Sequence, residues 1–258
     1  MRAFYHPDQA LHDPQQFLRH GRVMTSKDSP VRTEQLLRAL ERHGVSPEAP
    51  TAFGVAAART VHTESYLTFL ETIWSRWENV PERGPEVWPN AFPYWSGRVE
   101  DDARPPCPAQ GVIGQIGWYL GDLAAPIGPN SWTSILKSCE AAVTAADAIL
   151  AGDRAAYALC RPSGHHARWD RGSGLCYINN TAAAAQHLRQ RHNKVAILDI
   201  DAHHGDGTQQ IFYKRDDVLT ISIHADTSNY YPFFTGYAAE TGYGAGEGYN
   251  LNLPLAHG

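Results

Sequence analysis

One stretch of the chain joins an apolar run to a group of acidic and histidine residues: Val195-Ala196-Ile197-Leu198-Asp199-Ile200-Asp201-Ala202-His203-His204-Gly205-Asp206-Gly207. A continuous apolar run of this kind is typical of a strand in a parallel sheet that helices cover on both faces. Sites in such sheets form outside the carboxyl ends of the strands. The residues after this strand are therefore the first place to search for function.

Strands and helices alternate on either side of this stretch. Apolar runs predict strands at 155–161, 195–201, 218–225 and 249–255, and helical periodicity predicts helices at 31–42, 63–77, 134–150, 179–192 and 208–213. The alternation predicts an α/β fold with a mostly parallel central sheet flanked by helices. We expect a single domain over residues 1–258.

The segment at about 81–132 interrupts this pattern because it is dense in proline and tryptophan. Long loops without structure are uncommon in compact domains, so we expect an ordered, packed insertion. Such an insertion could narrow the entrance of a site or form a homodimer interface, and its aromatic content suits the interface. The run Glu100-Asp101-Asp102 within it would attract a cationic substrate, with a solvated loop as the equal alternative.

Composition excludes several classes of protein. The 258 residues include 22 Lys+Arg and 27 Asp+Glu, a net charge of -5 that disfavours nucleic acid or an anionic membrane as the main partner. Four cysteines lie far apart, as in a reduced cytoplasmic protein. The first residues lack the apolar region and the cleavage site that are typical of a signal peptide, and no apolar stretch approaches the roughly 20 residues that span a bilayer. We therefore expect a soluble, cytoplasmic protein.

Three predicted strand ends carry the polar residues that a site would need. They read Arg161-Pro162-Ser163-Gly164-His165-His166, Asp199 to Gly207 as quoted above, and Ser222-Ile223-His224-Ala225-Asp226. Because the carboxyl ends of parallel strands share one edge of the sheet, we expect these side chains to meet. Their grouping says more than the total of 13 histidines does.

Because side chains alternate between the two faces of an extended chain, we expect Asp199, Asp201 and His203 to point the same way. Ile200 and Ala202 should then point to the opposite side, into packing. Asp201 and His203 then form a two-ligand arm whose oxygen and nitrogen donors suit zinc. The alternative, a surface turn with an aspartate cap, leaves Asp199 unexplained. A carboxylate buried within an apolar strand needs a cation or strong hydrogen-bond donors.

The adjacent histidines His165 and His166 predict acid–base chemistry. A histidine near a metal-bound water can act as a general base, and a carboxylate behind it fixes its tautomer and raises its basicity. Asp199 and Asp206 are the candidate carboxylates. A helix start or a salt-bridged surface remains the alternative for this pair.

The motifs at the first two strand ends, together with Gly174-Leu175-Cys176-Tyr177-Ile178-Asn179-Asn180, resemble the histone deacetylase superfamily over most of the chain. The insertion and the stretch Tyr231-Pro232-Phe233-Phe234-Thr235-Gly236 resemble its bacterial acetylpolyamine amidohydrolase branch. The resemblance implies an arginase-like α/β fold and a zinc-dependent deacetylase.

The resemblance also implies a role for each site residue. Asp201 and His203 would bind Zn²⁺, while His165 and His166 would polarise the attacking water and protonate the leaving amine, backed by Asp199 and Asp206. Gly174 would contact the substrate amide, Cys176 would lie at the tunnel floor, and Tyr231 would wall the tunnel. Asp199, Ser222 and Ile223, with the carbonyls of Asp201 and His203, would hold K⁺ or Na⁺.

Two positions depart from the family pattern. Leu175 stands where the family usually has an aromatic residue that lines the tunnel. The family's third zinc ligand, an aspartate, and its transition-state tyrosine lie beyond the last residue, so we expect that the C-terminal part is missing. His224, Asp226 and His257 could be nominated as substitutes, but no spacing favours them. Two ligands alone predict weak metal binding and negligible activity.

The predicted function is therefore zinc-dependent removal of acetyl groups from N-acetylated polyamines of the acetylputrescine or acetylcadaverine type. Acetyl-lysine in a protein is the rival substrate. Two other classes stay open: a binuclear manganese ureohydrolase of arginase type, which would hold two metals and release urea, and a non-catalytic scaffold.

Overall fold

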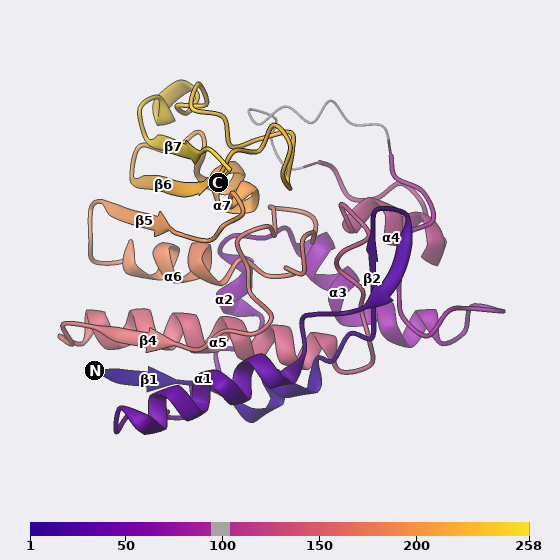
Figure 1. Ribbon diagram of the computed structural model, residues 1–258, viewed down its shortest axis with the longest axis horizontal. Coiled ribbons are helices and arrows are strands. Elements are labelled where there is room, and N and C mark those ends of the chain that lie inside the picture. Colours follow the sequence, from indigo (N-terminus) through magenta and orange to yellow (C-terminus); the bar gives the residue numbers. More distant parts are fainter. Residues whose placement is uncertain (94–103, 258) are drawn as a thin grey trace.

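A computed structural model describes residues 1–93 and 104–257 of the chain. Its largest sheet is parallel, in the order β5 (Val195–Asp199), β6 (Val218–Ala225) and β7 (Asn250–Leu255). A second parallel pair joins β1 (Arg2–Phe4) to β4 (Ala156–Ala158). Figure 1 shows these strands with helices packed beside them. The predicted α/β class is confirmed.

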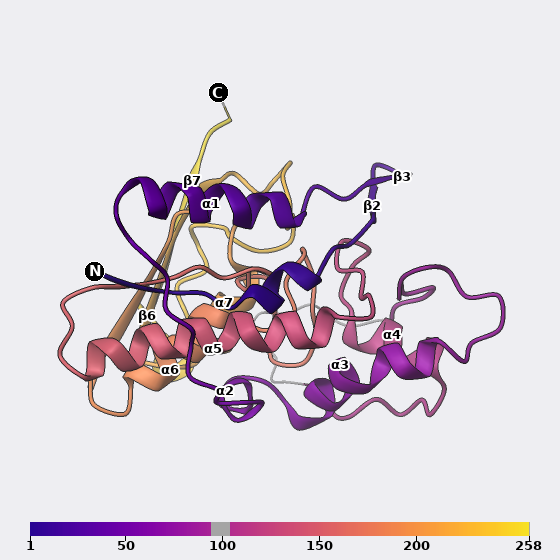
Figure 2. The same cartoon turned by 90° about the horizontal axis from the view of Figure 1, so that it is seen from below.

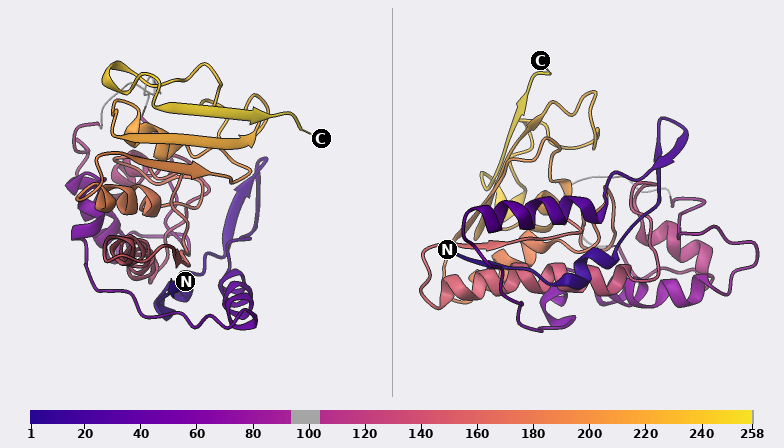
Figure 3. Two further views of the ribbon diagram at one scale, coloured as in Figure 1. Left: turned by 90° about the vertical axis from the view of Figure 1, so that its left-hand side faces the viewer. Right: turned by 60° about the horizontal axis from the view of Figure 1, so that its bottom comes forward.

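The remaining elements lie mostly around these strands. They are η1 (Pro7–Leu11), β2 (Gln16–Arg19), β3 (Arg22–Thr25), α1 (Pro30–Arg42), α2 (Ala56–Arg59), α3 (Glu64–Trp77), α4 (Val112–Tyr119), α5 (Ser131–Leu150), α6 (Asn180–Leu188), α7 (Asp206–Phe212) and η2 (Gly244–Gly246). β2 and β3 form an antiparallel hairpin, which projects from the body of the molecule in Figure 3. The sequence pattern indicated neither this hairpin nor β1 and α4.

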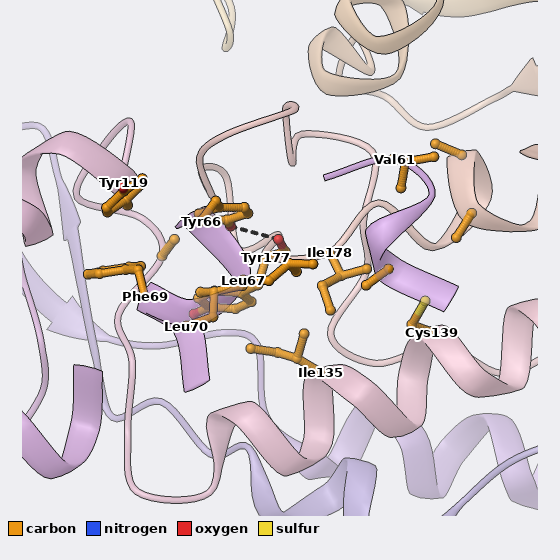
Figure 4. Packing of buried hydrophobic residues seen from close by; sticks show 14 of the residues in the cluster. Val61, Tyr66, Leu67, Phe69, Leu70, Tyr119, Ile135, Cys139, Tyr177 and Ile178 are labelled. Carbon is orange, nitrogen blue, oxygen red and sulfur yellow. Dashed lines mark hydrogen bonds between the residues drawn. The ribbon is translucent and has the colours of Figure 1, made fainter. Parts of the chain in front are cut away.

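The hydrophobic core lies where α3 packs against the segment that precedes α6. Tyr66, Leu67 and Leu70 of α3 are buried against Tyr177 and Ile178, as Figure 4 shows. The Tyr66 hydroxyl donates a hydrogen bond of 2.7 Å to the carbonyl oxygen of Tyr177. This core fixes the loop after β4, which carries the two adjacent histidines.

One face of the sheet β5–β6–β7 is exposed, so the expectation of burial on both faces is wrong. Figure 2 shows the strands nearly edge-on with α7 to one side. On the opposite face Leu198 is 61% exposed and Ile200 76%. Ile200 and Ala202 therefore do not point into packing, because nothing in the described ranges covers them.

The insertion is packed where the structure describes it. Val87 and Ile127 pair across a β-bridge, and both are buried. Ile116 and Tyr119 of α4 join the main core. The acidic run Glu100-Asp101-Asp102 lies outside the described residues. None of the helices described in 1–93 and 104–257 is long and apolar enough to cross a membrane.

Candidate active site

The strand ends bring two histidine–carboxylate pairs together. His165 Nδ1 lies 2.8 Å from Asp199 Oδ2, and His166 Nδ1 lies 2.7 Å from Asp206 Oδ1. The two imidazole rings are 4.0 Å apart, centroid to centroid. An ionised carboxylate only accepts, so each Nδ1 donates its proton to its carboxylate, and Nε2 has a lone pair whenever the ring is neutral.

The pair formed by His165 and Asp199 favours the charged imidazole. Burial lowers the pKa of His165, but the hydrogen bond to Asp199 and the charge of that carboxylate raise it above its ordinary value. The second carboxylate oxygen of Asp199 accepts a hydrogen bond of 3.0 Å from the backbone N–H of Asp201. Asp199 therefore has the strong donors that its position requires.

The pair formed by His166 and Asp206 is more deeply buried than the first pair. It also differs because a cation contacts its carboxylate. Burial and the nearby His165 lower the pKa of His166, although Asp206 opposes this shift. Arg168 donates to the other oxygen of Asp206 through Nε at 3.0 Å and through a terminal nitrogen at 2.7 Å. Arg168 shares the carboxylate with His166, whereas no such cation contacts Asp199 among the described residues.

Asp201 and His203 present donors that fit one zinc ion. Asp201 Oδ1 and His203 Nδ1 are 3.1 Å apart, on side chains that are 52% and 39% exposed. The two atoms are hydrogen-bonded to each other, and a carboxylate oxygen and an imidazole nitrogen are both ligands that zinc takes in proteins. The part of the chain that the structure describes holds no group of three or more His, Cys, Asp or Glu side chains suited to a metal. The donor pair fits zinc, and the described set stops at two.

Two tyrosines and a glycine turn form the walls beside these groups. Tyr230 stacks on His203 with the ring centroids 4.7 Å apart. The ring of Tyr231 meets His166 edge-on at 4.9 Å. Gly174 has a φ of +54° and lies so close that a Cβ there would collide with the His166 ring. A side chain at position 174 is therefore excluded both by conformation and by space.

The remaining wall and floor candidates lie near this turn. Leu175 is half-buried and also has a positive φ, +66°. Cys176 is fully buried, with its Sγ 3.4 Å from the Ser163 hydroxyl. Its burial raises the pKa of the thiol to about 12, so the thiol stays neutral.

The cation-site candidates lie on the covered face of the sheet. Asp199 and Ser222 are direct cross-strand partners, and both line a small cavity with Gln209 and Asn250. The Ser222 hydroxyl lies 2.8 Å from His224 Nδ1. Ile223 follows on β6 and does not line this cavity.

None of the substitutes nominated for a third zinc ligand joins Asp201 and His203. His224 is buried, with Nε2 donating to the carbonyl of Gly236 at 2.8 Å. His257 contacts the Asp226 carbonyl at 3.0 Å through Nε2. Among the described residues, none of these side chains therefore forms a group of three metal donors with Asp201 and His203.

Three residues of the site escaped the sequence pattern: Arg168, Asp122 and Tyr230. Arg168 lies two positions after His166. A cationic residue so close to the two adjacent histidines is a weak signal, but it could have indicated Arg168. Asp122 contacts Gly174 and Tyr231 from a loop 52 and 109 positions away. No local spacing could have found that contact.

Paired histidine–carboxylate groups beside two metal donors, at the ends of parallel strands, are typical of metal-assisted hydrolases. The histone deacetylase domain model matches residues 26–258. An acetylpolyamine amidohydrolase of Burkholderia pseudomallei is 44% identical over 259 residues, covering all of this chain and 73% of that protein. One from Mycoplana ramosa is 40% identical over 262 residues, covering all of this chain and 74% of its own length.

Solved structures agree with these similarities. The crystal structure of acetylpolyamine aminohydrolase from Burkholderia pseudomallei superposes with a TM-score of 0.93 at 44% identity, covering the whole chain and 73% of that structure. The HD domain of HDA15 reaches 0.75 at 23% identity, which concerns the fold alone. The chain belongs to the histone deacetylase family.

Proposed function

We propose that the protein hydrolyses the N-acetyl amide of acetylated polyamines. The observation that carries this proposal is the pair of histidine–carboxylate contacts, at 2.8 and 2.7 Å, beside the donors of Asp201 and His203. The names of the relatives, acetylpolyamine amidohydrolases, support the substrate class. Acetylputrescine and acetylcadaverine are its simplest members.

In the proposed reaction, the histidines take a proton from the attacking water and deliver one to the leaving amine. A histidine Nε2 takes the proton from the attacking water while the new carbon–oxygen bond forms. The pair then gives a proton to the amine nitrogen as the carbon–nitrogen bond breaks, which yields acetate and the free amine. Asp199 and Asp206 hold the two imidazoles in orientation through Nδ1. Zinc bound by Asp201 and His203 would supply a Lewis acid for the acetyl carbonyl.

The decisive experiment measures zinc and turnover on one sample of the purified protein, expressed from its full natural coding sequence. Because a two-donor site predicts weak binding, zinc is added in excess. Acetylputrescine is compared with an acetyl-lysine peptide, and we expect faster release of acetate from acetylputrescine. Preference for the peptide would favour the rival substrate. Urea release with two bound metals would indicate a ureohydrolase, and no turnover at any zinc concentration would contradict the proposal.

The first predicted variant is His166→Ala. General acid–base catalysis contributes about 10²–10⁴-fold, so we expect turnover to fall by that factor. Zinc content should stay at the wild-type level because His166 bonds to Asp206 rather than to the donor pair. Metal analysis beside the acetate assay checks both. The exposed His192, changed to Ala, serves as control, and parallel loss of zinc would make His166 a ligand.

We further propose a structural K⁺ or Na⁺ held by Asp199, Ser222 and Ile223 with the carbonyls of Asp201 and His203. The cross-strand pairing of Asp199 with Ser222, and the small cavity that both line, support it. Thermal stability in KCl compared with tetramethylammonium chloride at equal ionic strength tests it. An identical midpoint in both salts would argue against the site.

Three broader proposals complete the function. The single domain spans 1–258, the insertion at 81–132 forms a homodimer interface, and the protein works in the cytoplasm. The exposed Phe92 in the insertion is compatible with such an interface. Sedimentation analysis tests the dimer, and fractionation of cells tests the location.

A further inference from the structure

Asp122 is a carboxylate in the insertion that joins two walls of the site. Its Oδ2 accepts a hydrogen bond of 2.7 Å from the Tyr231 hydroxyl and one of 2.9 Å from the backbone N–H of Gly174. Its Oδ1 accepts one of 2.8 Å from the N–H of Ala124. Both carboxylate oxygens of Asp122 thus accept hydrogen bonds from other groups of the protein.

The two partners of Asp122 Oδ2, Tyr231 and Gly174, lie against His166. The Tyr231 ring meets the His166 ring at 4.9 Å with an interplanar angle of 87°. At Gly174 a Cβ would collide with the same imidazole, and it would lie 2.9 Å from the Tyr231 hydroxyl. A shift of Tyr231 or of the Gly174 turn by a fraction of an ångström would therefore change the space around the His166 ring.

The loop that carries Asp122 is tied to the glycine turn by its backbone as well. The N–H of Gly121 donates to the carbonyl of Gly172 at 2.7 Å, and the N–H of Gly172 donates to the carbonyl of Tyr119 at 3.0 Å. Burial and the charge of Asp122 raise the pKa of Tyr231 well above its ordinary value, so its hydroxyl keeps the proton that it donates.

We propose that Asp122 is a positioning residue that clamps Gly174 and Tyr231 against His166 and so sets the shape of the site around the acyl group. The inference rests on the proposed function, because it assigns Asp122 a part in that same site. A direct ion pair between Asp122 and the distal ammonium of the substrate is the competing role. The three donors already on the carboxylate favour positioning.

The test compares Asp122→Ala, Asp122→Asn and Tyr231→Phe, with Asp13→Asn as a control at an exposed aspartate. One readout, amide hydrogen exchange at Gly174, needs no turnover. The other is the kcat and KM for acetylputrescine and for N-pentylacetamide, a neutral substrate of similar length. Because Asn keeps an acceptor oxygen, it should restore part of what Ala loses.

For Asp122→Ala we expect exchange at Gly174 to accelerate about tenfold or more, since a hydrogen bond to a charged acceptor is lost. The kcat should fall by a similar factor on both substrates, with Asn intermediate. Tyr231→Phe should lower kcat while the Gly174 amide stays protected. This last variant keeps the ring and the carboxylate, so it remains informative if Asp122→Ala does not fold.

Unchanged exchange in Asp122→Ala and Asp122→Asn would overturn the clamp whatever the activity. A loss confined to the KM of acetylputrescine, with N-pentylacetamide unaffected, would also overturn it and assign Asp122 to the ammonium. If the wild type hydrolyses neither substrate, the proposed function fails, and the exchange measurement still decides whether Asp122 holds the wall.

Discussion

His62 can occupy its place only as a neutral imidazole. Its Nδ1 donates to the carbonyl of Arg168 at 2.8 Å, while its Nε2 accepts from the backbone N–H of Asn179 at 2.9 Å. A protonated ring would have two donors and could not accept the second bond. Burial accordingly lowers the pKa of His62 to about 4. This histidine links the start of α3 to the middle and to the end of the loop between β4 and α6, which carries His165 and His166.

We therefore predict that stability falls as the pH drops from about 6.5 to about 4. In that window the unfolded chain protonates His62 and the native protein does not, so acid favours the unfolded state. A shift from 6.5 to about 4 corresponds to about 3 kcal/mol. Urea unfolding of wild type and His62→Gln at several pH values measures it. An equal pH slope in both proteins would contradict the prediction, and His192→Gln is the exposed control.

At the scale of single residues, the sequence predicted which side chains meet when the strand ends carry them. Asp199 ends β5, Asp206 begins the helix that follows it, and His165 and His166 lie in the loop after β4. Parallel pairing brings the carboxyl ends of the strands to one edge. Asp122 could not be predicted in this way. Its loop reaches Gly174 through backbone bonds between distant segments, and no periodicity encodes those.

At the scale of elements, the sequence pattern predicted the limits of α3 and of β6 closely. The apolar face of α3 predicted its limits to within one residue, because that face packs into the core. The strand expected over 155–161 is limited to Ala156–Ala158. Beyond it, the N–H of Arg161 bonds to the Gln9 side chain and its guanidinium to Asp28, instead of extending the ladder.

The core position of α3 gives a prediction for Leu70→Ala. Leu70 is only 2% exposed, and replacing a buried leucine by alanine typically costs about 2–5 kcal/mol through lost burial and the remaining cavity. Urea denaturation should show a loss in this range. Thr68→Ala, at an exposed position of the same helix, should change stability by less than about 0.5 kcal/mol. Equal effects of the two changes would contradict the packing described for α3.

At the scale of the whole molecule, local patterns could not predict how each sheet face is covered. The apolar run of β5 predicts burial on both faces, but burial depends on which other segments reach the sheet. The register places Leu198, Ile221 and Leu251 in one row on the exposed face. On the covered face, Asp199, Ser222 and Asn252 form the matching row.

We predict that a protein made of these 258 residues self-associates through the exposed face of β5–β6–β7. Leu198 is 61% and Leu255 56% exposed, and contiguous apolar patches of this kind promote association. Static light scattering against concentration should show it. Leu198→Lys should reduce the apparent mass, whereas Leu36→Lys, at an exposed leucine of α1, should not. A monomer at every concentration would refute the prediction.

The collision that any Cβ would cause at Gly174 has a consequence for how this site can diversify. No larger residue can replace Gly174, because the His166 ring occupies the space that its side chain would need. Variation is left to the neighbouring Leu175, whose positive φ disfavours the β-branched residues valine, isoleucine and threonine. Evolution toward a new substrate therefore has few starting points on this wall, and they are unbranched side chains of different length.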